Sequence, residues 1–137
     1  MTTTELLLRP VGVVRSELRD REVAPMQGDE GAPDAWIELR PEVVRAAASL
    51  APGDELLVLT WFHEADRSVV EVHPRSDPSR SLTGVFSTRS PDRPNPVGLH
   101  RVRVLAVEKQ RIRVGPLEAI DGTPVIDLKP VLRTDGR

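Results

Sequence analysis

Short stretches in which apolar and polar residues alternate recur along this chain, and each predicts a strand. The clearest is Ala35–Leu39, and Val11–Val14 after Pro10 predicts an earlier one. Further strands are expected over 55–63, 69–72, 82–87 and 123–128. Residues 17–34 and 74–80 are polar and predict loops. This spacing is typical of an all-β fold rather than of alternating strands and helices.

The segments 102–104 and 111–114 alternate around Glu108-Lys109-Gln110 and predict a hairpin. Its valines and Ile112 would face inward. Four arginines would then share the outer face as a basic stripe: Arg101, Arg103, Arg111 and Arg113. Such a stripe suits either contact with RNA phosphates or a plain solvated surface.

Two segments depart from simple alternation. Residues 55–63 are almost continuously apolar and predict a central strand buried on both faces. Residues 41–50 predict the one helix, because Pro41 fits a first turn, Glu42 suits the helix dipole and alanines follow. Pro52-Gly53 would end it.

About eight short strands and one short helix therefore predict a mainly antiparallel small β-barrel or sandwich, with residues 1–137 as a single domain. The chain has 13 prolines and 9 glycines, which suit many turns, and it lacks the G-x-G-x-x-G fingerprint of dinucleotide-binding folds. It also lacks the G-x-S-x-G, P-loop and H-E-x-x-H motifs.

The absence of cysteine excludes a disulfide scaffold, a thiol nucleophile and a cysteine zinc site. His63, His73 and His100 show no metal-ligand spacing, so no metal is expected. The apolar run Leu6-Leu7-Leu8 is too short for a signal peptide or a membrane span. We therefore expect a soluble cytoplasmic protein with no membrane partner.

The formal net charge of −2 conceals two opposite halves. Residues 17–72 hold 13 acidic and 5 basic side chains, whereas residues 73–113 hold 3 acidic and 9 basic ones. A basic half of this kind suggests a polyanionic partner on one side of the molecule.

The densest group of candidate site residues lies in 84–99. Its prolines fix the backbone before any ligand binds, which lowers the entropy lost on binding. Arg89 and Arg93 offer two guanidinium groups, with Asn95 and several hydroxyls beside them. The alternative is that these arginines only cap carbonyls of the loop.

Two further side chains are candidates for acid–base chemistry. His63 lies at the wet end of the apolar run, although a single histidine is more often structural. Asp127 lies in the apolar stretch Val125-Ile126-Asp127-Leu128, where a carboxylate needs a partner or a ligand. Asp121, in Asp-Gly, is expected to be a turn residue only.

Two motifs carry a resemblance to a known family. They are Gly84-Val-Phe-Ser-Thr-Arg-Ser-Pro-Asp-Arg-Pro-Asn-Pro-Val-Gly-Leu99 and Asp121-Gly-Thr-Pro-Val-Ile-Asp-Leu-Lys-Pro130, preceded by Pro10-Val-Gly-Val-Val-Arg-Ser16. With them the chain resembles the TrmO/TsaA-like (VirR-like) proteins over about residues 10–132. It looks like a short form with one domain.

The resemblance implies a small β-barrel that binds S-adenosylmethionine, forms a homodimer and methylates N6-threonylcarbamoyladenosine beside the anticodon of tRNA. The cofactor contacts that it implies are Met26, Gln27, His63, Glu64, Arg89, Leu99, Val125, Ile126, Asp127 and Leu128. Asp127 and His63 are the candidates for a catalytic base. Arg93, Asn95 and Lys129 are expected to contact the substrate.

Two alternatives stay open. Asp54-Glu55-Leu56-Leu57 stands where the family usually has Ser-His-aromatic-Trp, which suits a methyltransferase of the same fold that acts on a small molecule or another nucleotide. Met26 replaces the arginine of the family's Pro-Arg-Gln segment, which suits a non-catalytic module that binds S-adenosylmethionine.

Overall fold

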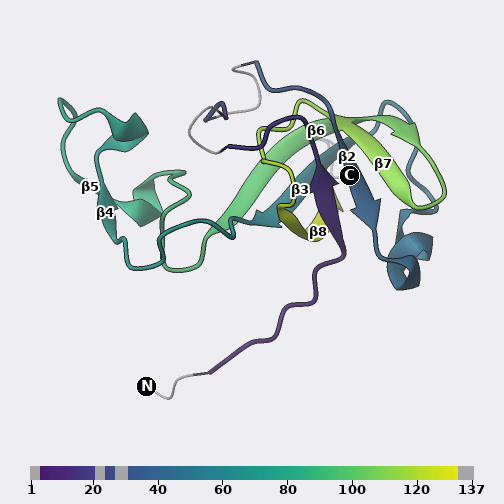
Figure 1. Ribbon diagram of the computed structural model, residues 1–137, viewed down its shortest axis with the longest axis horizontal. Helices are drawn as coiled ribbons and strands as arrows, with labels where there is room; N and C mark the ends of the chain where they lie inside the picture. The colour runs from purple at the N-terminus through teal and green to yellow at the C-terminus, as the bar shows by residue number, and fades with distance from the viewer. Residues whose placement is uncertain (1–3, 21–23, 27–30, 133–137) are drawn as a thin grey trace.

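The computed structural model describes residues 4–20, 24–26 and 31–132. Six antiparallel strands close into a barrel in the order β1-β2-β7-β6-β3-β8 (Figure 1). Their bounds are β1 Gly12–Arg15, β2 Ala35–Leu39, β3 Glu55–Trp61, β6 Val97–Val107, β7 Arg111–Gly115 and β8 Pro124–Pro130. The predicted all-β antiparallel barrel is confirmed.

The barrel interior holds the apolar core. Side chains alternate between the two faces of a regular strand, so such a strand sends every second residue inward. Residues 0–2% exposed fill the centre: Val14, Ile37, Leu56, Val58, Val102, Val104, Ile112, Val114, Leu117 and Val125. The predicted hairpin is confirmed as β6 and β7, with Ile112 inside and the four arginines outside.

The apolar run at 55–63 forms β3, but the expectation that both its faces are buried is wrong. Its burial alternates: Leu56, Val58 and Thr60 are buried, and Leu57, Leu59 and Trp61 are half-buried. The latter group covers the outer face of the barrel wall. The continuous apolar sequence therefore marks an outer surface that is itself apolar.

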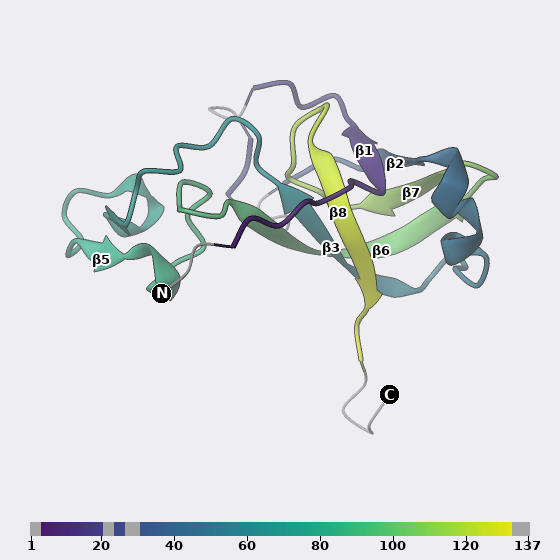
Figure 2. The ribbon, with the colours of Figure 1, turned by 90° about the horizontal axis from the view of Figure 1, so that it is seen from below.

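A small second sheet lies beside the barrel. It pairs β4 (Glu71–Val72) with β5 (Thr83–Gly84), and both Figure 1 and Figure 2 place it at one end of the molecule. The predicted strands at 69–72 and 82–87 were therefore too long. Residues Val85–Ser87 instead form the 3₁₀ helix η4, and Pro74–Ser76 form η3.

The predicted helix over 41–50 is a 3₁₀ helix, η2, which spans Pro41–Ala47. Pro41 does open it and Glu42 lies in its first turn. The residue before it, Arg40, makes no side-chain capping bond, and the β-branched pair Val43-Val44 disfavours an α-helix. Over the ranges that the structure describes, no helix is both long enough and apolar enough to cross a membrane.

Candidate functional site

A row of three side chains crosses the outer wall of the barrel. In the register of the sheet, Leu59 of β3 pairs with Leu99 of β6 on one side and with Asp127 of β8 on the other. Paired residues of an antiparallel sheet share a face. Leu99 is 43% exposed and the Asp127 side chain is 51% exposed, so this face is the outer one. The fold thus unites two predicted site residues with Leu59, which sequence reasoning missed.

A β-bulge in β8 determines where Asp127 points. The pairing with β3 shifts between Leu59 and Thr60: Leu59 faces Asp127, whereas Thr60 faces Val125. Ile126 is therefore the extra residue. Val125 is fully buried, and regular alternation would send Asp127 into the core with it. The bulge instead turns Asp127 outward, which is a common use of bulges next to active sites.

Asp127 has a partner within its own strand. The Lys129 ammonium lies 3.8 Å from its Oδ2, and the Leu128 N–H donates to its Oδ1 at 2.9 Å. The premise that a carboxylate in this apolar stretch would be buried is wrong, because the bulge exposes it. The outer face holds two predicted residues, Asp127 and Lys129, with opposite charges.

The proline-rich loop before β6 is built around Arg93. Its Nε donates to the Ser90 carbonyl at 2.7 Å, and its Nη2 donates to the carbonyls of Val85 and Thr88. These are the carbonyl contacts that the sequence left open as the alternative to ligand binding. Arg93 therefore holds the loop together, and its predicted contact with substrate stays a prediction.

Arg67 fastens this loop to the end of β3. Its Nε donates to the Pro94 carbonyl at 2.7 Å and its Nη2 to Asn95 Oδ1 at 3.0 Å. Its guanidinium also lies 5.0 Å from the centre of the Trp61 ring. The Asn95 carboxamide, predicted to contact substrate, is thus engaged by Arg67. Nothing in the sequence pattern singled out Arg67.

A second link joins the same two segments. The Asp66 N–H donates to Asp92 Oδ1 at 2.9 Å. The Asp66 carboxylate accepts from the Ser68 hydroxyl at 2.6 Å and from the Ser68 N–H at 2.9 Å, and these bonds lower the pKa of Asp66 below its ordinary value. The segment after β3 is therefore shaped locally and tied to the loop.

Three further predicted polar residues, His63, Glu64 and Arg89, lie in the two segments that these bonds join. The Phe62 N–H donates to the Pro96 carbonyl at 2.8 Å, which places His63 beside the end of the loop. His63 Nε2 and Glu64 Oε2 lie 3.8 Å apart, and both side chains are exposed. Arg89 is exposed too, and its guanidinium forms no hydrogen bond or ion pair within the described ranges.

The other predicted cofactor contacts differ in how far they are buried. Val125 points into the core, Leu128 packs against it, and Ile126 is the half-buried bulge residue. Met26 is 50% exposed. Gln27 lies outside the described residues.

The basic stripe on the hairpin is largely neutralised. Arg101 pairs with Glu55 at 3.0 Å, Arg113 with Asp34 at 3.1 Å and Arg111 with Glu108 at 2.7 Å. Arg103 donates to the Gly53 carbonyl. The same pattern continues on β1, where Glu38 lies 2.9 Å from Arg15 and raises its pKa.

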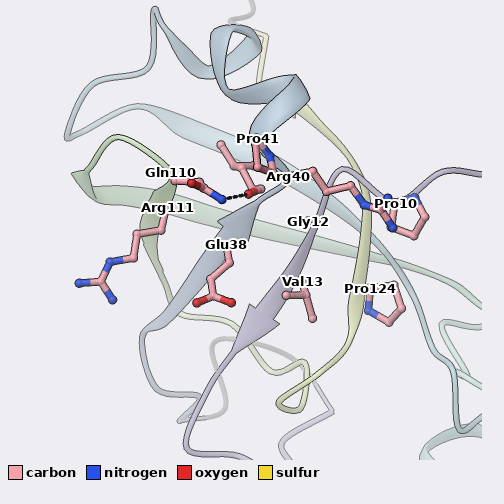
Figure 3. Close-up of a pocket in the computed structure, with 10 residues that line it drawn as sticks. Pro10, Gly12, Val13, Glu38, Arg40, Pro41, Gln110, Arg111 and Pro124 are labelled. Atoms are coloured by element: carbon pink, nitrogen blue, oxygen red, sulfur yellow. Dashed lines mark hydrogen bonds between the residues drawn. The ribbon is translucent and has the colours of Figure 1, made fainter.

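The side of the barrel opposite the Leu99–Leu59–Asp127 row holds a groove of about 540 Å³ over β1 and β2 (Figure 3). Figure 3 shows the rings of Pro10, Pro41 and Pro124 around it, with the Gln110 amide bound to the Leu39 carbonyl at 3.1 Å. A second groove of about 430 Å³ surrounds Trp36 and Arg113. Neither groove contains a predicted site residue.

A buried polar chain, also missed by sequence reasoning, lies beneath the row. Thr60 Oγ1 lies 2.7 Å from His100 Nε2, and His100 Nδ1 is hydrogen-bonded to Glu118 Oε1. Thr60 is fully buried, which excludes it as an exposed nucleophile. The alternation of β6 could have revealed this chain, because it puts His100 on the inward face with Val102 and Val104. A buried imidazole needs hydrogen-bond partners.

Comparison with known proteins places these features in a family. A model described as the tRNA-methyltransferase O N-terminal domain matches residues 13–135. A protein of Methanothermobacter thermautotrophicus named as a probable S-adenosyl-L-methionine-binding protein is 45% identical over 95% of this chain and 93% of its own length. One from Archaeoglobus fulgidus, named as an S-adenosyl-L-methionine-binding protein, is 38% identical over 90% of this chain and 88% of its own.

The solved structures agree. TrmO from Pseudomonas aeruginosa superposes with a TM-score of 0.74 and 28% identity over 98% of this chain. This chain spans 61% of the length of that protein. The relatives' names support the predicted cofactor, and the match over residues 13–135 confirms the resemblance. The chain belongs to the tRNA-methyltransferase O family.

Proposed function

We propose that this protein is an S-adenosylmethionine-dependent methyltransferase whose acceptor is N6 of threonylcarbamoyladenosine beside the anticodon of tRNA. The observation that carries the proposal is the outer row Leu99–Leu59–Asp127, in which Leu99 lies on β6, the strand that directly follows the loop holding Arg89. This acceptor would also place the protein in the cytoplasm.

The side chains present suit the proposed cofactor. Leu59, Leu99 and Trp61 offer an exposed or half-buried apolar surface for an adenine ring. Arg89, with no partner in the described chain, is available for the α-carboxylate. Asp127 supplies a carboxylate for the ribose hydroxyls or for a cationic group. When bound, the cofactor would supply a methyl group on a positively charged sulfur.

The protein's task in such a transfer is positioning. Holding two reactants in line accounts for a large share of the acceleration in displacements of this kind. A ureido-substituted nitrogen is a weak nucleophile, so an acceptor for its proton assists the step. Asp127 and His63 are our candidates, and Asp127 is favoured because the bulge directs it to the apolar row.

The decisive experiment is mass spectrometry of tRNA nucleosides from a strain that lacks this protein. We expect one methylated nucleoside to disappear, to return with the wild-type gene and to stay absent with Asp127→Asn. That variant keeps the shape of the side chain and removes only an ion pair that is half-exposed. An unchanged nucleoside profile in the deletion strain would rule out the tRNA assignment.

A small-molecule or other nucleotide acceptor is the second candidate. It is favoured by the ion pairs that neutralise the hairpin arginines, since they leave few free charges for RNA phosphates. Transfer of methyl label from S-adenosylmethionine to a small molecule in tRNA-free extract would support it. No transfer to any fraction, with the cofactor still bound, would support the non-catalytic module.

We also propose that two copies associate through the apolar row. The row lies on the outer wall of the barrel, and neither described groove contains it. One chain alone would therefore contact a bound ligand from one side only. Leu99→Glu should yield a monomer with weakened cofactor binding in analytical ultracentrifugation and calorimetry. Val107→Glu, at a similarly exposed position near the far end of β6, should leave both unchanged. A wild-type monomer would contradict this part.

A further inference from the structure

We propose that Glu118, His100 and Thr60 form a buried relay that positions the Leu99–Leu59–Asp127 row for cofactor binding. The inference rests on the proposed function, because it assigns these three residues a role in that same site. None of the three would touch the cofactor. They would act as positioning residues through the strands that carry the row.

The relay is largely buried, and each of its three side chains is hydrogen-bonded to the next. The His100 side chain is 1% exposed and that of Glu118 13%. Burying polar groups costs free energy unless each finds a partner. Here His100 Nδ1 is hydrogen-bonded to the Glu118 carboxylate and His100 Nε2 to the Thr60 hydroxyl, so both ring nitrogens have partners. The carboxylate thereby fixes the orientation of the ring.

The relay lies directly behind the row. Thr60 follows Leu59 along β3, and His100 follows Leu99 along β6, so each inward relay residue adjoins an outward row residue. Thr60 is also the residue at which the pairing with β8 shifts, next to the bulge that exposes Asp127. One hydrogen bond between Thr60 and His100 therefore joins β3 to β6 at the point where β8 bends.

Gly98 makes room for that bond. A Cβ at this position would lie within 3.0 Å of Thr60 Oγ1, Phe62 Cζ and His100 Nε2. The Phe62 ring meets the imidazole edge-on, with the ring centres 5.7 Å apart, and helps to seal the relay. The absence of a side chain at Gly98 and the packing of the Phe62 ring both favour the Thr60–His100 contact. The surrounding residues are thus fitted to this hydrogen bond.

The test compares Thr60→Val, which removes the hydroxyl and keeps the shape, with Thr60→Ser, which keeps the hydroxyl. Thr60→Val should weaken S-adenosylmethionine binding about tenfold in calorimetry, because a misplacement of about 1 Å can cost about 100-fold and the strands would shift by less. It should also move the Leu59 and Leu99 methyl signals in NMR spectra of the ligand-free protein. Thr60→Ser should restore both to near wild-type values.

Thr123→Val is the matched control. Its hydroxyl is equally buried but donates to the Ile120 carbonyl at 2.7 Å, outside the relay. It should lower Tm without changing affinity or the row's methyl signals. Should Thr60→Val not fold, Glu118→Gln replaces it, with a shift of the hydrogen-bonded imidazole N–H signal of His100 showing that the relay is altered.

Two results would overturn the inference. One is wild-type affinity together with unchanged Leu59 and Leu99 signals in Thr60→Val. The other is loss of affinity in Thr123→Val to the same extent, which would reduce the relay to a contribution to folding. If the wild-type protein binds no cofactor, the proposed function fails instead, and the ligand-free methyl signals still decide whether the relay positions the row.

Discussion

At the residue scale, Arg89 and Arg93 are the same residue type in one loop, but they differ in the hydrogen bonds that the fold gives them. The sequence offered both as ligand-binding forks. Arg93 is committed to three carbonyls, whereas Arg89 has no bonding partner in the described chain. A free guanidinium in a loop braced by its neighbours is the better ligand contact.

Arg89→Ala should therefore weaken S-adenosylmethionine binding while Tm stays unchanged. A hydrogen bond to a charged group contributes about 1.5–3 kcal/mol, or roughly 10- to 150-fold in Kd. Calorimetric titration and thermal unfolding measure the two effects. Arg40→Ala is the control, since Arg40 is also exposed and lies in the groove on the opposite side. Equal affinities of wild type and Arg89→Ala would contradict the assignment.

Asp66 gives a prediction that depends on pH. The Ser68 hydroxyl is the main cause of its lowered pKa, so Ser68→Ala should raise that pKa toward the ordinary 3.8. Because the folded pKa is depressed, the stabilisation from this bond is present above the ordinary pKa and is lost as pH falls through the folded one. Carboxyl-carbon NMR titration measures the shift.

The internal control is Asp77, which has the same arrangement with Ser79. Ser79→Ala should raise the pKa of Asp77 alone, and Ser68→Ala that of Asp66 alone. A shift of neither pKa would show that the serine hydroxyls do not set them.

At the scale of elements, the loop before β6 depends on a residue outside it. Arg67 spans from the Trp61 ring to Pro94 and Asn95, so it couples the end of β3 to the loop. Lysine keeps the charge but lacks the planar fork that makes this double contact.

Arg67→Lys should loosen the loop and weaken cofactor binding roughly fivefold, the equivalent of about 1 kcal/mol. Hydrogen exchange at the amides of residues 88–96 should become faster, while the amides of β7 stay protected. Arg45→Lys, an exposed arginine on η2, should change neither. Unchanged exchange in the loop would show that its prolines alone keep it rigid.

Sequence reasoning succeeded where local pattern decides structure. The bounds of β2 follow directly from the alternation in Ala35–Leu39, and the inward face of the hairpin follows from Val102, Val104 and Ile112. It failed where contacts with residues distant in sequence determine the structure. The bulge at Ile126 exists only against Leu59 and Thr60, and the relay needs Glu118, 58 residues beyond Thr60.

At the scale of the whole molecule, folding joins the acidic and basic halves of the sequence through two ion pairs. Glu55 and Asp34 come from the acidic half, and each pairs with an arginine of the basic half. A polyanionic partner that approaches the hairpin therefore meets three arginines, Arg101, Arg111 and Arg113, that already have counterions.

The binding of tRNA should consequently depend only weakly on salt. Asp34→Asn combined with Glu55→Gln would free Arg113 and Arg101, and should steepen the slope of log affinity against log salt by about 0.9 per freed charge. Fluorescence anisotropy of labelled tRNA at several salt concentrations measures it. Glu42→Gln, on η2, is the control. An unaltered slope in the double variant would place RNA elsewhere on the surface.

The bulge in β8 also changes which positions of the strand face the core. Before it, the inward position is 125, and after it the inward position is 128, so buried sites follow a step of three rather than two. A scan of polar substitutions along β8 should be tolerated at 127 and 129 and rejected at 125 and 128. Deleting Ile126 would bring the two halves back into phase, which makes this strand a place where the loss of a residue is compatible with the fold.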